Sequence, residues 1–422
     1  MQSSGGINTL KVLLQKEFSL FIATRFILIF SLFLQNTVVS YKLYSLTKNP
    51  LSLGLVGLFE VIPAFACAFF AGYVVDRKEK RSVYLLCILG YILNAILFLY
   101  ITSTSFTHQY SVSAMERFIY MGMFISGFIR AFLAPSSFSL LPLLVKKEDI
   151  PFAITWSSTS WMLGSVLGPL VGGILLAHYG ISISIAFALV LLCVSSFFIL
   201  AIKRKPIQYS KDIGIIKGLA QGFRFVFRNQ LILAVLSLDL FAVLFGGAEA
   251  LLPVVSTDIL QVGEVGYGWL RSAHGIGAIF LLLVLTYIPL KNHVGKKLFL
   301  CVGLFGLCIL FFGLSTSFIL SFFLLFFAGL FDGVSVVIRH SILQMKTPEH
   351  LKGRVSSINM MFISSSNELG AFESGFTARY LGTVPAIVLG GFMTIAVVIS
   401  TYFLAPQLKN LNAMEDEPVN DA

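Results

Sequence analysis

Long apolar runs separated by short polar segments fill almost the whole chain of 422 residues. A bilayer core about 30 Å thick is crossed by about 20 apolar residues in an α-helix, and we count twelve runs of that length. The runs are too long and unbroken for the strands of a transmembrane β-barrel. The predicted spans are 17–43, 51–75, 82–103, 115–145, 151–178, 181–202, 229–257, 264–290, 298–315, 318–345, 353–378 and 383–405.

The longest polar segment lies near the middle of the chain, with six runs on each side of it. This layout predicts an all-α polytopic membrane protein, with twelve transmembrane helices in two pseudo-symmetric six-helix bundles. We expect an N-terminal bundle at 1–202, a cytoplasmic linker at 203–228, a C-terminal bundle at 229–406 and a disordered cytoplasmic tail at 407–422.

The linker itself has a helical pattern. Apolar residues recur at helical spacing from Ile216 to Phe227, while Lys217, Arg224 and Arg228 lie on another face. This predicts a basic amphipathic helix on the anionic inner leaflet. A plain solvated linker helix is the alternative.

Composition agrees with a membrane protein. Apolar residues make up 57% of the chain and charged residues 12%, against about 25% charged in soluble domains, and the mean hydropathy is +0.89. A water-soluble enzyme and a disordered chain are therefore excluded. We see neither a phosphate-binding loop nor a nucleophile–base pair, so we expect a protein that is not an enzyme.

The net charge of +10 comes mainly from basic residues in short loops between the apolar runs. Such loops favour the cytoplasmic side, so we expect both termini to be cytoplasmic in a bacterial inner membrane. Nucleic acid is not an expected partner. The five cysteines lie in apolar runs without metal-ligand spacing, so we expect no disulfide, metal or cofactor.

The loop after the second run contains Gly72, Asp76, Arg77 and Arg81 at the spacing G-x-x-x-D-R-x-x-[RK]-[RK]. It resembles the signature loop of the major facilitator superfamily in both sequence and position. The resemblance implies a gating loop. Gly72 would allow a neighbouring helix to approach, Asp76 would sit at the N-terminus of another helix, and the arginines would pair with that carboxylate or with lipid phosphate. A loop that only sets orientation is the alternative.

The fifth run carries a glycine and proline pattern that is similar to the antiporter motif G-x-x-x-G-P-x-x-G-G of the same superfamily. Glycines four apart form one flat stripe for helix packing, and proline is expected to kink the helix. The resemblance implies export, whereas generic small-residue packing is the alternative. The residues are Gly164, Gly168, Pro169, Gly172 and Gly173.

Two further stretches, from Leu238 to Gly246 and from Thr347 to Val355, resemble the bacterial exporters that include the enterobactin exporter and macrolide efflux proteins. Together, the resemblances imply the major facilitator fold and alternating access around a cavity between the bundles. They also imply a small-molecule substrate such as a siderophore or drug.

Charged residues inside the apolar runs are the main chemical evidence. Each costs about 2.5–3.5 kcal/mol near a helix centre on insertion scales, so a transport site or an internal ion pair is the default explanation. If each arginine pairs once, two of the six acids lack an arginine partner and are free to bind protons. The candidates are Arg25, Glu60, Arg130, Asp239, Glu249, Arg271, Asp332, Arg339, Glu368 and Glu373.

The sequence therefore favours proton-coupled export of an amphiphilic small molecule by a protein that is expected to be a monomer in contact with membrane lipids. An uncoupled facilitator or lipid flippase is the second hypothesis, and a transport-dead receptor is a third. The charges could instead form structural pairs. His274, three residues after Arg271, is either a titrating group or a structural hydrogen-bonding residue.

Overall fold

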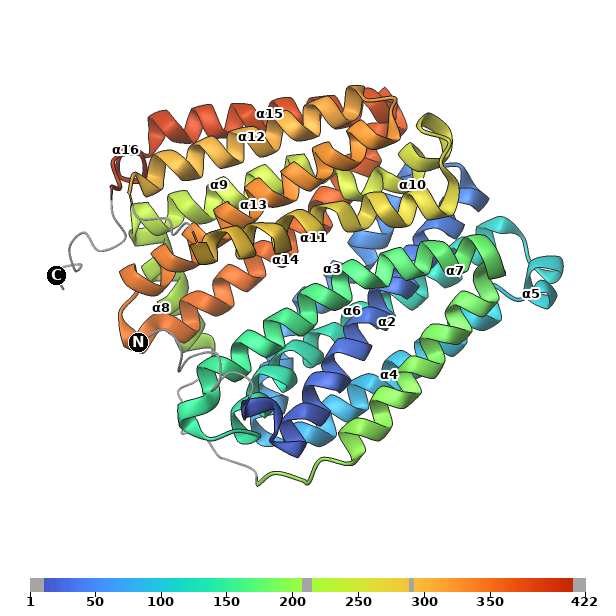
Figure 1. Cartoon of the computed structure of the whole chain (residues 1–422), viewed down its shortest axis with the longest axis horizontal. Coiled ribbons are helices and arrows are strands. Elements are labelled where there is room, and N and C mark those ends of the chain that lie inside the picture. The colour runs from blue at the N-terminus through green and yellow to red at the C-terminus, as the bar shows by residue number, and fades with distance from the viewer. Residues whose placement is uncertain (1–10, 207–214, 288–291, 413–422) are drawn as a thin grey trace. The chain divides into compact units, whose positions relative to one another are not determined.

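The structure is a computed structural model that describes residues 11–206, 215–287 and 292–412 (Figure 1). Within these ranges the regular structure is helical and no strand occurs. The all-α class is thus confirmed. The chain divides into two compact units, which we describe separately. Unit 1 is Met1–Lys48, Phe59–Lys211 and Gly263–Ser272, and unit 2 is Asn49–Leu58, Asp212–Val262 and Ala273–Ala422.

Unit 1 contains most of the helices of the first half of the chain and the first part of α11. Its core lies where α2, α4, α6 and α7 meet, around buried residues such as Phe21, Tyr84 and Leu192. The elements are α2 (Lys16–Thr47), α3 (Pro50–Arg77, from Phe59 on), α4 (Lys80–Ile101), α5 (Thr104–Gln109), α6 (Val112–Leu140), η1 (Leu141–Leu143), η2 (Lys147–Asp149), α7 (Ile150–Leu200) and α11 (Gly263–Tyr287, to Ser272).

Unit 2 has two buried apolar clusters, one around Leu238, Leu298 and Ile338 and one around Val226, Ile232 and Val355. In Figure 1, α12 and α15 run side by side. In addition to the first part of α3 and the rest of α11, its elements are α8 (Ile215–Arg228), α9 (Gln230–Gly246), η3 (Ala248–Leu251), α10 (Leu252–Val254), η4 (Val255–Ile259), α12 (Val294–Leu314), α13 (Phe318–Lys346), η5 (Glu349–Leu351), α14 (Lys352–Leu381), α15 (Thr383–Leu404) and α16 (Pro406–Lys409).

Ten stretches of the described chain are long and apolar enough to cross a membrane. One of them, 54 residues long, contains α7, whose backbone leaves helical geometry at Gly180 with φ of +76°. A positive φ of this kind suits glycine, so this stretch corresponds to the predicted spans 151–178 and 181–202. Helix α14 has 30 residues but is too polar to be among the ten. The count of twelve therefore stays a prediction.

Three local features differ from expectation. The backbone of α7 stays helical through Pro169, and the break falls at Gly180 instead. The predicted span 229–257 is interrupted after Gly246 by a short 3₁₀ turn and a π-helical turn. Part of the tail expected to be disordered is ordered: α16 buries Leu408, and the Gly295 N–H donates to the Leu411 carbonyl. Residues 413–422 lie outside the described ranges.

The linker contains the predicted helix, α8, but its buried face is shifted. Gly222 and Val226 are buried, and Val226 packs with Ile232 of α9 and Val355 of α14, whereas Phe227 is 59% exposed. The predicted apolar face used Phe227, one residue further along. A protein surface therefore covers part of α8. The side chains of 215–219 lie outside the description, and contact with a leaflet stays a prediction.

Candidate functional site

A buried ion pair joins α9 and α13 in unit 2. An Nη1 of Arg339 contacts a carboxylate oxygen of Asp239, and both side chains are almost fully buried. Two charges removed from water are stable together only because each compensates the other. The pair is therefore a neutral ion pair inside the bundle, and loss of either partner would leave a buried, uncompensated charge that destabilises the fold.

One turn of α11 brings His274 between two further carboxylates. Its Nδ1 lies 3.8 Å from Oε1 of Glu249, and its Nε2 lies 3.9 Å from Oδ2 of Asp332. The ring also meets Phe305 edge-on, with centroids 6.5 Å apart. Both carboxylates are within ion-pair range if the imidazole is protonated.

A glycine on α13 explains how α11 comes this close to Asp332. A Cβ added to Gly329 would lie 1.9 Å from the carbonyl oxygen of His274, so only glycine permits this approach. Gly329 precedes Asp332 by three residues, which places both on one face of α13. The helix contact and the His274–Asp332 approach thus depend on the same face.

Unit 1 repeats this arrangement with different charges. A Cβ added to Gly127 of α6 would lie 2.0 Å from the carbonyl oxygen of Glu60 on α3. Three residues after Gly127, Arg130 donates from Nη1 to Oε1 of Glu60 at 2.8 Å. In each unit, a glycine brings two helices together and a charged residue one turn later reaches the facing helix.

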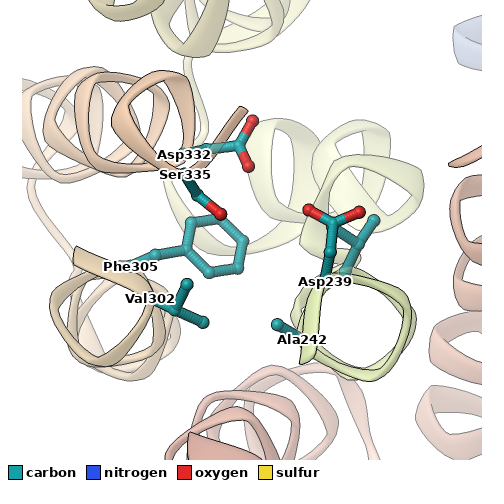
Figure 2. Close-up of a pocket in the computed structure, with 7 residues that line it drawn as sticks. Asp239, Ala242, Val302, Phe305, Asp332 and Ser335 are labelled. Atoms are coloured by element: carbon teal, nitrogen blue, oxygen red, sulfur yellow. The ribbon is translucent and has the colours of Figure 1, made fainter. Parts of the chain in front are cut away.

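Asp239 and Asp332 line one small cavity of unit 2, with the Ser335 hydroxyl beside them (Figure 2). Its cavity volume is about 10 Å³, which is about the least that holds one water molecule. The space is too small for an amphiphilic substrate. The remaining lining residues are Ala242, Val243, Val302 and Phe305.

The other two arginines bond to neutral groups. Arg25 donates from Nε to the Ser157 carbonyl and from Nη1 to the Ser137 hydroxyl. Arg271 donates to the Asn36 amide oxygen at 2.8 Å and to the Tyr267 hydroxyl at 3.0 Å. All these contacts lie within unit 1. Arg130 and Arg339 thus each have a carboxylate partner, whereas the hydrogen bonds named here for Arg25 and Arg271 go to neutral groups.

The last two candidates lie on α14 and do not line the cavity. Glu373 accepts a hydrogen bond from Thr377 at 2.8 Å. The backbone carbonyl of Glu368 faces Gly57 of α3, where an added Cβ would lie 2.9 Å away. The structure therefore collects Asp239, Arg339 and Asp332 with His274 and Glu249, and leaves these two acids elsewhere in unit 2.

The predicted gating loop is held to unit 1 mainly by Arg81, through backbone carbonyls rather than through a carboxylate or lipid phosphate. An added Cβ on Gly72 meets no described atom within 4 Å, and the Asp76 side chain is exposed. Arg77 stacks over the Tyr73 ring at 4.1 Å. Arg81 is buried and donates to the last carbonyls of α7, at Ile199 and Leu200. Within the ranges that the structure describes, Asp76 caps no helix, and its role in gating stays a prediction.

Glu79 caps α4 instead. Its carboxylate accepts hydrogen bonds from the backbone N–H groups of Arg81 and Ser82 and from that of Lys205, where the linker begins. Partial burial acts to raise the pKa of Glu79, but hydrogen bonds from Ser82, Lys205 and Arg81 outweigh it and hold the pKa below its usual value. The ionised carboxylate therefore ties the first turn of α4 to the start of the linker.

Replacing Glu79 with Gln should destabilise the protein by about 1 kcal/mol, as loss of an N-cap does. Because the pKa of Glu79 is lower in the folded protein, its contribution is present at neutral pH and is lost as the pH falls through that lowered pKa. Thermal unfolding of the purified protein between pH 7 and pH 3 should show a smaller loss of stability for E79Q. An acid-side decline equal to that of the wild type contradicts the assignment.

The glycine stripe of α7 packs against two helices within unit 1. Added Cβ atoms would lie 2.9 Å from the Phe30 nitrogen at Gly164 and 2.7 Å from the Phe30 carbonyl oxygen at Gly168. At Gly173, the nearest atom is the Glu264 carbonyl oxygen of α11, 2.5 Å away. The stripe therefore fixes α7 against the backbones of α2 and α11, and Gly172 faces Leu34 less tightly, at 3.2 Å.

Gly168→Ala should lower the stability of the folded protein by about 1–3 kcal/mol, because the methyl group meets backbone that cannot move aside. Gly303→Ala on α12 is the matched control, since its Cβ meets only Val398 at 3.9 Å. Melting temperatures in detergent measure both. Equal melting temperatures for the two variants would show that the stripe tolerates a side chain.

The fold, the buried charges and the glycine stripe together define a multi-pass membrane transporter. The family described as transmembrane secretion effector matches residues 7–421. The chain belongs to this family of the major facilitator superfamily, as the resemblance at its loop and glycine motifs predicted.

Relatives agree with this assignment. The enterobactin exporter EntS of Escherichia coli O1:K1 / APEC is 26% identical over 394 residues, which cover 91% of each chain. A D-xylose-proton symporter of known structure has a TM-score of 0.72 at 12% identity, covering 93% of this chain and 98% of that one. The human organic anion transporter MFSD10 (TETRAN) has a TM-score of 0.63 at 16% identity, with 92% and 99% covered. At such identities, the solved structures show the fold alone.

Proposed function

We propose that this protein is a proton-coupled exporter of an amphiphilic small molecule that works by alternating access in the bacterial inner membrane. The observation that carries the proposal is the group of His274, Asp332 and Glu249 beside the Asp239–Arg339 pair. Titratable groups inside a membrane bundle are expensive and are typical of proton relays. Membership of a secretion family supports transport, and the exporters of enterobactin among its relatives support outward movement.

The coupling step uses the groups of unit 2. A proton bound by the His274–Asp332 pair changes the charge beside the cavity, and the Asp239–Arg339 pair responds because it lines or adjoins the same space. A proton that binds one conformation better than another shifts their populations by that difference in affinity. Alternating proton occupancy thereby drives the conformational exchange that moves substrate.

The orientation proposed from the loop charges places both termini in the cytoplasm. Protons then enter the His274 group from the outer side and leave to the inner side as substrate moves outward. The protein acts as a monomer in this account, since one chain supplies all the groups named.

Everted membrane vesicles containing the protein test the proposal. When the vesicle interior is more acidic than the outside, the vesicles should accumulate enterobactin or a drug-like amphiphile such as a macrolide. Collapse of the pH gradient with a protonophore should stop this accumulation. Vesicles without the protein are the control. Substrate uptake that does not depend on the pH gradient would favour an uncoupled facilitator or flippase. Substrate binding without flux would favour a receptor.

A further inference from the structure

The small cavity of unit 2 joins the two groups of buried charges in that unit. Its walls come from three helices: Asp332 and Ser335 from α13, Asp239 from α9, and apolar side chains of α12 (Figure 2). Asp332 faces His274, and Asp239 is paired with Arg339. The cavity therefore connects the group proposed to take up the proton with the buried ion pair.

The two carboxylates differ in how accessible they are. The side chain of Asp332 is 25% exposed, whereas that of Asp239 is 8% exposed and that of its partner Arg339 is 3% exposed. A proton can arrive at Asp332 by way of His274, which lies 3.9 Å away. Asp239 is shielded, and the cavity is the space that it shares with Asp332. A proton on Asp332 can thus reach Asp239 through the cavity.

One water molecule fits this space. The cavity volume of about 10 Å³ is close to the least that a water requires, and a buried water typically makes about 2–4 hydrogen bonds. The carboxylates of Asp239 and Asp332 accept hydrogen bonds, and the Ser335 hydroxyl both donates and accepts. These three polar groups of the lining therefore supply the number of partners that a buried water needs.

Ser335 lies where it can orient that water. It is one turn after Asp332 and one turn before Arg339, so the three residues share a face of α13. Its side chain is buried. Val302 and Phe305 of α12 form an apolar wall of the same cavity, so the hydrogen-bonding groups lie on α9 and α13.

We propose that one water molecule in this cavity, positioned by Ser335, passes a proton from Asp332 to Asp239. The carboxyl O–H bond of protonated Asp332 breaks as its proton joins the water. The water gives one of its own protons to the Asp239 carboxylate and is thereby regenerated. Asp332 ends ionised and Asp239 ends neutral, with the total charge unchanged. This inference rests on the proposed function and assigns the order in which its groups carry the proton.

The charged groups at the two ends of this path link the transfer to conformation. His274 stands between Asp332 and Glu249, at 3.9 and 3.8 Å, on the side where the proton enters. On the other side, the Arg339 cation attracts the ionised Asp239. The proton is therefore transferred when a change in conformation separates that pair, and neutral Asp239 then keeps the pair open.

X-ray radiolytic labelling with mass spectrometry tests the water directly, because hydroxyl radicals formed from a bound water label the side chains beside it. Phe305 lines the cavity, whereas Phe299 on the same helix does not, and they are 7% and 4% exposed. In the purified full-length protein, we expect Phe305 to be labelled faster than Phe299. Equal labelling of the two rings in the wild type overturns the inference.

Ala242→Val fills the cavity and leaves every charged group in place, since Ala242 is part of its lining. The labelling of Phe305 should fall to that of Phe299. Gradient-driven accumulation in everted vesicles should fall by about 5- to 150-fold, the range of ordinary coupling free energies, while downhill movement of substrate continues. Ala386→Val is the matched control, because Ala386 is a buried alanine of unit 2 outside this cavity. Wild-type accumulation in Ala242→Val overturns the inference.

Ser335→Ala provides a second test that does not require added volume. It removes one of the three partners of the water and no charge, so gradient-driven accumulation should fall by about fivefold, as expected for one neutral hydrogen bond. The ratio of driven to downhill flux should fall with it, which a purely structural role of Ser335 would not produce. An unchanged ratio overturns the inference.

Flux through the wild type separates failure of this inference from failure of the proposed function. Flux that does not depend on the pH gradient contradicts the proposed function and, with it, the proton path. Gradient-driven export that persists at the wild-type level in either Ala242→Val or Ser335→Ala contradicts the proton path alone.

Discussion

Asp332→Asn should abolish the response of export to the pH gradient while leaving downhill movement of substrate in place. Asp332 faces His274 across 3.9 Å and lines the small cavity with Asp239, so the amide removes a proton site without removing volume. Coupling free energies of ordinary size predict a loss of gradient-driven accumulation of about 5- to 150-fold. Initial rates in everted vesicles with and without an imposed gradient measure it.

The control for this variant is Glu116→Gln. Glu116 is a carboxylate near the start of α6 that accepts a hydrogen bond from Tyr120 and lies outside the His274 group. It should accumulate substrate as the wild type does. Full gradient dependence in Asp332→Asn would remove this carboxylate from the coupling scheme.

Arg339→Gln should destabilise the protein by about 3–5 kcal/mol, because it leaves the Asp239 carboxylate buried without its counter-charge. Asp239→Asn should have an effect of similar size for the opposite reason, since it leaves the guanidinium unpaired. The double variant removes both charges and should recover much of the lost stability. Thermal unfolding in detergent, with yield of folded protein as a second readout, measures all three.

These three variants form a double-mutant cycle, and the informative quantity is the interaction free energy between the two substitutions. Two residues in direct contact should show strongly non-additive effects, with the double variant more stable than the sum of the single effects predicts. Additive losses would mean that Asp239 and Arg339 act independently, and the account of a compensated pair beside the cavity would then fail.

The fold could be predicted from the sequence because the membrane leaves few choices. Any apolar run of this length must satisfy its backbone hydrogen bonds internally, so it forms a helix. Even the break inside α7 falls at Gly180, between two predicted spans. Helix α14 is the exception, because it is too polar to be among the ten apolar stretches although it overlaps the predicted span 353–378. Its role as a twelfth or eleventh crossing therefore stays a prediction.

Partners within the site were less predictable. The cost of burial singled out the charged residues one by one, but helical periodicity gives only the face on which each lies. Glu60 and Arg130 are 70 residues apart in sequence, and their contact depends on Gly127 bringing α3 and α6 together. A glycine three residues before a charged residue of a membrane span, as at Gly127 and Gly329, is a sequence signal for such a contact.

The loop after α3 shows a different limit. The resemblance placed Asp76 at the N-terminus of another helix, and that contact stays a prediction. The cap of α4 is Glu79, which was not among the predicted residues. A cap is defined by the residue at which a helix begins, and α4 begins at Lys80, two residues before the predicted start of the span. Apolar patterning defines helix ends only to within a few residues, so it does not identify the capping side chain.

Proton movement in step with substrate movement tests the central claim most directly. Proteoliposomes with the purified protein, a pH-sensitive dye inside and no imposed pH gradient receive a substrate gradient alone. The account predicts that substrate flux drives protons in the opposite direction in the wild type, and that Asp332→Asn carries substrate without moving protons. Substrate flux through the wild type with no change in internal pH would contradict it.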